Sequence, residues 1–141
     1  MTLQIDSKVV DARLRELSHR LKRLAAKKPA SLRRLTESED LQDIVSRNLE
    51  LAIQTCIDIA MHLCGACDVV PASSGEAFTA LADTKLITRP LAQRLRRAVG
   101  FRNVLVHQYV EVDWKIVQRI IERDTANLAA FGKAVSKLIE D

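Results

Sequence analysis

Apolar residues recur at helical spacing along the N-terminal part of the chain. After Asp6 they follow one another at steps of four and three residues, which places them in one stripe on an α-helix. The stripe consists of Val10, Leu14, Leu17, Leu21 and Leu24. Asp6 is a typical N-cap, and Ile5 before it can pack against Val10 as a hydrophobic staple. The pattern predicts a helix that begins at Asp6 and ends before Pro29.

A longer helix is predicted next. Thr36 and Glu39 have the spacing of a capping box, and apolar residues then continue from about Asp40 to Cys67. These residues wrap most of the helix circumference instead of forming one stripe. They are Leu41, Ile44, Val45, Leu49, Leu51, Ile53, Cys56, Ile57, Ile59, Ala60 and Leu63. The pattern is typical of a central helix, or of one that is half core and half interface.

Three further helices complete the predicted fold. A short one begins at Ser73, a fourth begins near Thr88 with Pro90 in its first turn, and the last runs from Asp113 to about Ile139. Repeats, low-complexity tracts and long linkers are missing from the sequence. We therefore expect residues 1–141 to form a single helical domain, an all-α up-and-down bundle of about four to five helices.

The composition agrees with an all-α chain. It contains four glycines and three prolines, and only 4% of its residues are aromatic. No apolar run approaches the roughly 20 residues that a membrane span needs, and the N-terminus lacks a signal-peptide core. Cys56, Cys64 and Cys67 are odd in number and lie in an apolar helix, which argues against a secreted disulfide framework. The sequence predicts a cytoplasmic protein that does not bind a membrane.

A metal site is not predicted. His62, Cys64 and Cys67 resemble half of a zinc site, but a structural zinc needs about four ligands. The sequence has no second cluster of cysteine and histidine to complete it. Packing in the core is the favoured interpretation of the cysteines.

Charge is distributed unevenly. The net charge is +4, yet residues 18–36 and 85–110 contain no acidic residue. These two stretches hold thirteen of the twenty-two lysines and arginines. A polyanionic partner such as RNA would explain this segregation, and so would a solvated basic face without a partner.

Candidate chemistry is concentrated between residues 100 and 109. On a helical wheel, Arg102 and Tyr109 fall within the core-facing stripe. Asn103 and His107 fall on the neighbouring face together with Arg96. The apolar members of the stripe are Leu91, Leu95, Ala98, Val99 and Val106.

A guanidinium within an apolar stripe requires a partner, because burying an unpaired charge costs several kcal/mol. That partner would be a carboxylate from another helix, a second subunit or an anionic ligand. Glu50 and Asp58 on the long helix are candidates for the first. A purely structural arginine–carboxylate pair with a hydrogen-bonded histidine beside it remains an alternative.

The segment from Arg102 to Tyr109 resembles a known family. It matches the Arg-x-x-x-x-His-x-Tyr signature of HEPN-domain proteins, and specifically of the HepT-like toxins. The resemblance extends over roughly residues 5–140. Its other parts are the segments 47–50, 57–63, 74–78, 91–92 and 99–101.

This resemblance implies a small helical HEPN bundle that dimerises and brings two signatures to a shared cleft. It implies a metal-independent endoribonuclease without a cofactor, acting on RNA such as mRNA or tRNA as the toxin of a toxin–antitoxin pair. The partner would be a minimal nucleotidyltransferase antitoxin, MntA-like, that transfers AMP to Tyr109. Arg102 and His107 become the catalytic residues, and Asn103 matches the common form of the signature.

The residue types suit such chemistry. The 2′-hydroxyl of RNA can attack the adjacent phosphate, with His107 as general acid or base and Arg102 stabilising the phosphoryl oxygens. Asn103 would hold the imidazole or the phosphate, and Asp58 is expected to support Arg102. A further pair, Arg96 and Arg97, are candidate RNA contacts. The alternative is a non-catalytic HEPN module that uses the same pocket to bind a nucleotide or a partner beside a nucleotidyltransferase.

Overall fold

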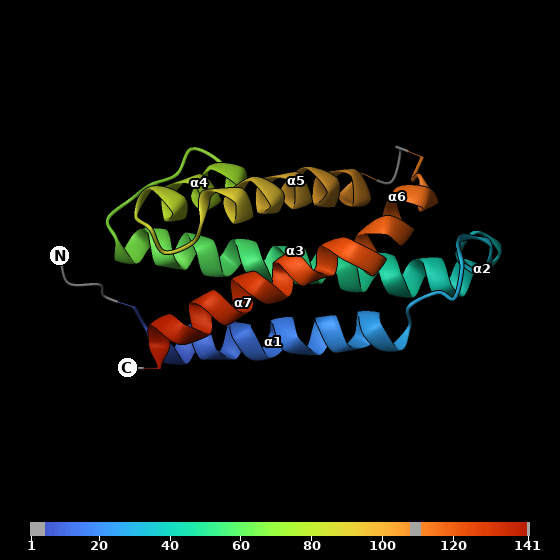
Figure 1. Ribbon diagram of the computed structural model, residues 1–141, viewed down its shortest axis with the longest axis horizontal. Helices are drawn as coiled ribbons and strands as arrows, with labels where there is room; N and C mark the ends of the chain where they lie inside the picture. The colour runs from blue at the N-terminus through green and yellow to red at the C-terminus, as the bar shows by residue number, and fades with distance from the viewer. Residues whose placement is uncertain (1–4, 108–110, 141) are drawn as a thin grey trace.

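The computed structural model describes residues 5–107 and 111–140, and their regular elements are all helical. Its centre is α3 (Glu39–Ala66), which contacts α1 (Ser7–Ala26) and α7 (Thr125–Ile139) as well as α4 (Ser74–Asp83) and α5 (Arg89–Val106). In Figure 1, α1 lies on one side of α3 and α4 with α5 on the other, while α7 crosses obliquely over α3 and α1. The predicted all-α bundle is confirmed.

Most predicted helix starts are confirmed, because the predicted cap side chain accepts a backbone N–H in each. Asp6 accepts hydrogen bonds from the amides of Lys8 and Val9 at the start of α1. The other confirmed caps are Ser73 for α4, Thr88 for α5 and Asp113 for α6 (Trp114–Arg119). Each cap satisfies an amide that the helix itself cannot pair.

The predicted Thr36 capping box is wrong. A short helix, α2 (Leu32–Glu37), occupies this region, and the Thr36 hydroxyl donates to the Leu32 carbonyl within it at 2.8 Å. Ser38 is the actual N-cap of α3, accepting from the amide of Leu41 at 3.1 Å. Ser31 caps α2 in the same way. Because Ser38 offers the same kind of oxygen two residues later, spacing alone does not separate the two caps.

The last predicted helix is interrupted. It begins and ends as expected, but α6 passes into a π-helical turn at Ile120–Asp124 before α7 begins. The turn follows buried Gln118, whose side-chain amide donates to the Pro29 carbonyl at 3.2 Å and to Glu122 at 2.7 Å. A π turn adds one residue to the helix, so the faces of α6 and α7 are offset from one another.

The prediction of a central helix is confirmed for α3. Twelve of its residues are buried, and they lie around most of its circumference. By length and composition α3 is also the one helix among the described residues that could cross a membrane, although its apolar runs are too short to predict this from the sequence. Slightly more than half of its most apolar stretch is buried against other helices, as in the core helix of a globular protein. Packing therefore accounts for its apolar character.

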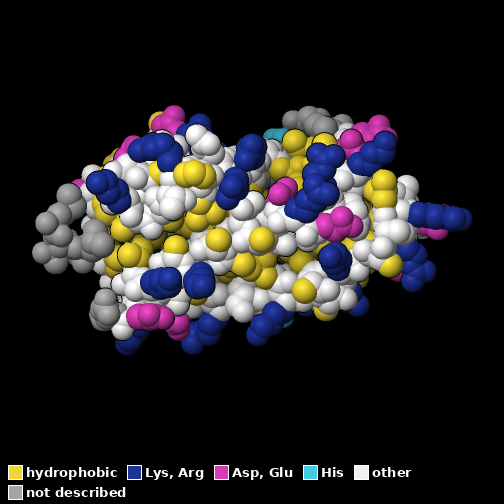
Figure 2. Space-filling model, in the orientation of Figure 1, with side chains coloured by type: hydrophobic (Ala, Val, Ile, Leu, Met, Phe, Trp, Pro, Cys, Tyr) yellow, Lys and Arg dark blue, Asp and Glu magenta, His cyan; other side chains and the backbone are white. Residues whose placement is uncertain are grey.

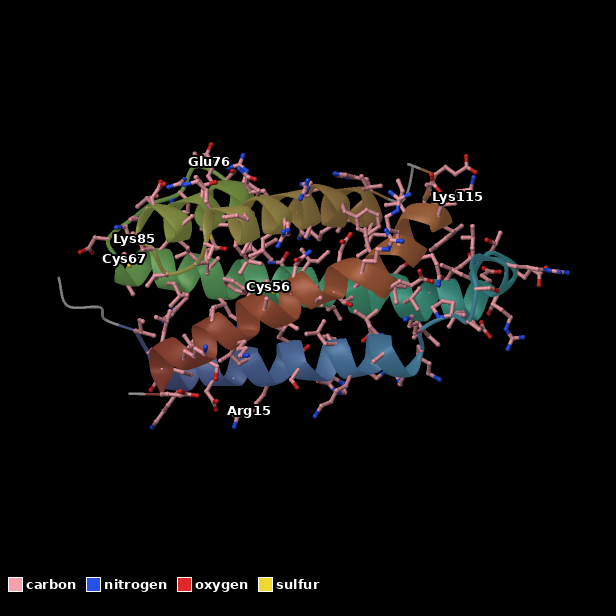
Figure 3. The ribbon with its side chains drawn as sticks, viewed as in Figure 1. Arg15, Cys56, Cys67, Glu76, Lys85 and Lys115 are labelled. Atoms are coloured by element: carbon pink, nitrogen blue, oxygen red, sulfur yellow. The ribbon has the colours of Figure 1, made fainter. Side chains whose placement is uncertain are left out.

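Core packing also accounts for the cysteines. Cys56, Cys64 and Cys67 are buried, and Figure 3 shows Cys56 near the middle of α3 and Cys67 at its end. Burial raises the pKa of the Cys56 thiol far above its usual range. Burial, and then the neighbouring Cys67, raise the pKa of Cys64. His62 accepts a hydrogen bond from the Asp6 amide at 3.3 Å, so it serves the start of α1.

An aromatic pair joins α7 to α4. The rings of Phe131 and Phe78 meet edge to face, with centroids 5.4 Å apart, and both side chains are fully buried. Nearby, α7 approaches α1 closely at Gly132, where a Cβ atom would lie 3.1 Å from Leu17 Cδ2. These contacts close the bundle over α3.

We expect Phe131→Ala to lower the free energy of unfolding by about 3–5 kcal/mol, because it leaves a cavity at the junction of α7 and α4. Denaturant unfolding followed by circular dichroism measures the change. The exposed Lys133→Ala on the same helix is the control and should change it by less than about 0.5 kcal/mol. Equal effects of the two substitutions would show that the aromatic pair does not hold α7.

Candidate functional site

The candidate segment lies at the C-terminal end of α5. The helix buries Ala92, Leu95 and Val99 against the core and ends at Val106. His107 is its C-cap, with a non-helical backbone (φ −84°, ψ 89°), and its amide donates to the Asn103 carbonyl at 3.3 Å. This hydrogen bond fixes the His107 backbone at the end of the helix.

The predicted helical wheel holds only as far as the helix does. Val106 was placed in the core-facing stripe, but 41% of it is exposed, and this prediction is wrong. Past Val106 the helical angles no longer apply, because the backbone leaves the α conformation at His107. Tyr109, the predicted site of modification, lies outside the described residues.

Arg102 is half-buried without a carboxylate. Its Nη1 donates to Asn103 Oδ1 at 3.0 Å, while its Nε is buried and has no hydrogen-bond partner. Among the described residues, no ion pair includes Arg102. Because the guanidinium keeps its positive charge at all physiological pH values, it remains able to bind an anion.

The expectation that Asp58 supports Arg102 is wrong. Its carboxylate lies 3.7 Å from Arg13 of α1 and accepts a hydrogen bond from Gln54 at 2.9 Å. Phe101, beside Arg102, instead shares a cavity with Leu49 of α3. Asp58 lies nine residues farther along α3, about 14 Å along its axis. The other candidate, Glu50, pairs with Arg47 at 3.3 Å.

Asn103 contacts Arg102. Its side-chain oxygen accepts the hydrogen bond from the Arg102 guanidinium, while a contact with the imidazole or the phosphate stays a prediction. Its backbone carbonyl accepts the His107 amide. Asn103 thus connects the two predicted catalytic residues, one through its side chain and the other through its main chain.

The two predicted RNA contacts are placed apart. Arg96 lies across α4, where its Nη1 donates to Thr79 Oγ1 at 2.7 Å and its stem passes over Gly75. Arg97 lines a cleft on the other flank of α5. Arg96 is therefore engaged by its own fold, while Arg97 remains available to a ligand.

That cleft lies between α5 and the segment formed by α6, the π turn and the start of α7. Its volume is about 340 Å³, and its floor includes Leu49 and Ile53 of α3. The other lining residues are Arg94, Arg97, Ala98, Phe101, Ile116, Arg119, Ile120, Asp124, Asn127 and Leu128. Arg94, Arg97 and Phe101 occur at helical spacing, which the sequence could have revealed. Arg119 comes from another helix, and only the tertiary structure brings it here.

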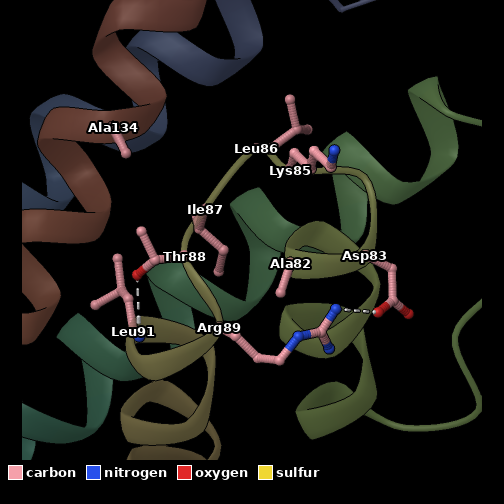
Figure 4. Close-up of a pocket in the computed structure, with 9 residues that line it drawn as sticks. All are labelled: Ala82, Asp83, Lys85, Leu86, Ile87, Thr88, Arg89, Leu91 and Ala134. Atoms are coloured by element: carbon pink, nitrogen blue, oxygen red, sulfur yellow. Dashed lines mark hydrogen bonds and ion pairs between the residues drawn. The ribbon is translucent and has the colours of Figure 1, made fainter.

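A second, larger pocket lies at the turn between α4 and α5 (Figure 4). Its volume is about 530 Å³. Arg89 pairs with Asp83 at 3.1 Å, and the Thr88 hydroxyl accepts the Leu91 amide at 3.3 Å. These polar groups already serve the turn and the helix cap, so among the described lining residues only exposed Lys85 carries a charge without an ion pair.

Comparison with known proteins identifies the family. The family model "Ribonuclease HepT-like" matches residues 13–135, most of the chain. The chain belongs to the HepT-like ribonuclease family. The mRNA nuclease HepT of Shewanella oneidensis is 39% identical over 92 residues, which cover 64% of this chain and 69% of that protein. The tRNA nuclease HepT of Aphanizomenon flos-aquae is 30% identical over 110 residues, covering 77% and 75%.

Solved structures show the same HepT-like fold. A toxin–antitoxin complex with AMP-PNP contains a chain with a TM-score of 0.86 and 28% identity, covering 92% of this chain and 98% of that one. The tri-AMPylated HEPN toxin of Shewanella oneidensis in complex with its MNT antitoxin gives 0.85 and 29%, covering 92% and 97%. The Bacillus subtilis cytosolic protein YutE, at 21% identity, shares the fold. The predicted family, helical fold and ribonuclease class are confirmed.

The absence of an ion pair at Arg102 can be tested by measuring protein stability. We expect Arg102→Met to leave the free energy of unfolding unchanged or slightly higher, because it removes a buried N–H without a partner. Arg20→Met is the comparison, since Arg20 binds both Glu16 at 2.8 Å and buried Asn48 at 3.1 Å. That variant should lose about 1–3 kcal/mol, as Asn48 is left without its donor. Denaturant unfolding of both variants measures this, and a larger loss for Arg102→Met would contradict the description.

Proposed function

We propose that this protein is a metal-independent endoribonuclease, the toxin of a toxin–antitoxin pair, acting on mRNA or tRNA in the cytoplasm. The observation that carries the proposal is the Arg102 guanidinium, held by Asn103 next to His107 and without a carboxylate among the described residues. Names of the relatives, mRNA nuclease and tRNA nuclease, support the substrate class. The family model supports the reaction class.

In the proposed reaction the nucleophile comes from the substrate. The ribose 2′-oxygen forms a bond to the adjacent phosphorus as the bond from phosphorus to the 5′-oxygen breaks. The 2′-hydroxyl loses its proton to a base, and the departing 5′-oxygen receives one from an acid. The products are a 2′,3′-cyclic phosphate and a 5′-hydroxyl, and neither a metal nor a cofactor is needed to balance the step.

Arg102 stabilises the negative charge that develops on the phosphoryl oxygens, the task that a metal ion performs in other nucleases. Its planar fork can donate two hydrogen bonds to one phosphate. Asn103 is a positioning residue, because it fixes the guanidinium before the substrate arrives. This preorganisation removes part of the cost of ordering the side chain in the transition state.

His107 transfers the proton at one side of the phosphate. One imidazole cannot act as both acid and base in the same step, so a second group is needed. We infer that a homodimer supplies it as the second copy of His107. Val104 and Val106, next to the candidate residues, are 38% and 41% exposed and offer apolar surface for such an interface.

Regulation of this site is part of the proposal. A minimal nucleotidyltransferase antitoxin, MntA-like, would transfer AMP from ATP to the Tyr109 oxygen, with pyrophosphate leaving. The tri-AMPylated state of the Shewanella toxin in its complex supports this chemistry. The added phosphate places negative charge two residues from His107, which would repel an RNA backbone.

We expect His107→Ala to reduce RNA cleavage by at least about 100-fold, because it removes the proton-transfer group. His19→Ala is the control, since His19 is an exposed histidine of α1. Cleavage of total RNA by the two purified variants, with and without a chelator, measures both activity and metal independence. Full activity of His107→Ala would overturn the assignment. RNA binding without cleavage by the unmodified protein would favour the non-catalytic HEPN module.

Co-expression with its nucleotidyltransferase partner is expected to add one or more adenylates at Tyr109. Intact-mass and peptide mass spectrometry locate the modification, and Tyr109→Phe, which lacks the acceptor oxygen, is the control. Modified protein should lose cleavage activity while retaining its helical circular dichroism. Adenylates found only at other residues would contradict the assignment of Tyr109.

A further inference from the structure

The cleft that begins beside Arg102 is lined by arginines without partners. Within the described residues, Arg94, Arg97 and Arg119 form neither an ion pair nor a side-chain hydrogen bond. Six arginines elsewhere in the described chain are already paired with carboxylates. They are Arg13, Arg15, Arg20, Arg33, Arg47 and Arg89. Three of the arginines without an ion pair therefore lie together at this cleft, where a polyanion can bind them.

The floor of the same cleft is apolar. Phe101 contributes an aromatic ring, and Ile116 is 42% exposed at its edge. A nucleobase has a flat apolar face that packs on such side chains, whereas a bare phosphate does not need them. Bases reach a floor of this kind only when they are unstacked, as in single-stranded RNA. Figure 2 shows basic and apolar side chains together over the region where α5 approaches α6.

The charge along the cleft is not uniform. Arg94 and Arg97 lie on the α5 wall, while the opposite wall carries Arg119 at the end of α6, Asp124 at the end of the π turn and Asn127 in α7. Asp124 occupies the N-cap position of α7 but makes no capping hydrogen bond. Its carboxylate would repel a phosphate, so the RNA backbone is expected along the arginines. Asn127, whose amide can both donate and accept, then faces the base edge.

We propose that this cleft holds the single-stranded RNA segment adjoining the phosphate that Arg102 and His107 act on, with Arg94, Arg97 and Arg119 binding its backbone. The proposal rests on the proposed ribonuclease function. Arg94 and Arg102 are separated by about 12 Å along α5, a distance that a short single-stranded RNA segment can span, so it can contact both residues at once. The cleft volume, about 340 Å³, lies within the range of small-ligand sites. RNA that reaches the catalytic residues through this cleft is bound by its arginines before it is cleaved.

The test is the double substitution Arg97→Glu with Arg119→Glu, made in a His107→Ala background so that RNA is not cut. The probe is a fluorescein-labelled single-stranded oligouridylate, and its binding is measured by fluorescence anisotropy over a range of salt concentrations. We expect affinity to fall at least about tenfold, and the salt slope to fall by about 1.4, since each lost single-strand phosphate contact removes about 0.7.

The matched control is Arg15→Glu with Lys22→Glu in the same background, which changes the net charge by the same amount. Both residues lie on α1, and Arg15 projects from the side of the molecule opposite α5 (Figure 3). Screening limits their effect on RNA in the cleft, so affinity should fall less than about threefold. Equal losses for the two double variants would overturn the proposal, because net charge alone would then explain binding.

The outcomes separate this proposal from the proposed function. With His107 intact, undiminished cleavage by the Arg97→Glu, Arg119→Glu variant overturns the cleft and leaves the ribonuclease standing. Unmodified protein that binds the oligouridylate through the cleft but cleaves no RNA overturns the ribonuclease and leaves the cleft standing. Sedimentation of the same variant tests whether a second copy of the chain occupies the cleft. If the substitutions dissociate a dimer, the cleft is a dimer interface and the RNA assignment is overturned.

Asp124→Asn is expected to raise the affinity for RNA, a result that misfolding of the variant would not produce. Removing the carboxylate takes away a repulsive charge from the cleft and keeps the shape of the side chain. We expect the affinity for the oligouridylate to rise about two- to threefold at low salt, with a smaller gain at high salt. The matched control is Asp43→Asn at an exposed position of α3, which should change affinity less. No gain for Asp124→Asn would show that RNA does not pass this wall.

Discussion

Burial of α3 on most of its circumference is the constraint on which the rest of the structure depends. A helix that is apolar nearly all round must be covered from several sides, and α1, α4, α5 and α7 do so. This cover fixes α5 through Ala92, Leu95 and Val99. Arg102 and Asn103, in its last turn, are therefore carried on a rigid element, as a preorganised site requires.

Where the helices begin was largely predictable because capping is local. Asp6, Ser73, Thr88 and Asp113 each cap the helix that follows them, and each was identified from the sequence. One local signal misled. Thr36 has the residues of a capping box but lies inside α2, and Ser38 is the N-cap of α3. The π turn has no sequence signature, since it depends on how α6 and α7 pack against other helices.

The candidate site was predictable in part for a similar reason. Arg102, Asn103 and His107 are close in sequence, so their proximity follows from helical geometry. Asp58 and Arg102 lie on different helices, and their separation depends on the register of α5 against α3, which no local pattern states. The cleft was not predicted for the same reason, because it depends on how the helices pack. Its α5 wall is periodic, but Arg119 joins it only through the packing of α6.

The distribution of ion pairs separates structural from available charge. Arg20 is held by Glu16 and Asn48, and Arg89 by Asp83, so their charges are largely neutralised locally. Arg102 has only the neutral oxygen of Asn103. Leaving it unneutralised reduces the stability that a paired arginine could contribute, which is a common feature of functional sites. The acid-free stretch 85–110 achieves this by keeping carboxylates away from α5 in sequence.

The π turn at Ile120–Asp124 also lets the two parts of one long helix, α6 and α7, pack independently of each other. Because it absorbs one residue, α6 and α7 can each keep their own packing: Val117 and Gln118 of α6 and Phe131 of α7 are all buried. Exposed side chains of α6 at the cleft, such as Arg119, can thus be substituted while the packing of α7 on α3 stays fixed. Substitutions at such exposed positions would alter the contacts that we propose for RNA while leaving the helical core intact.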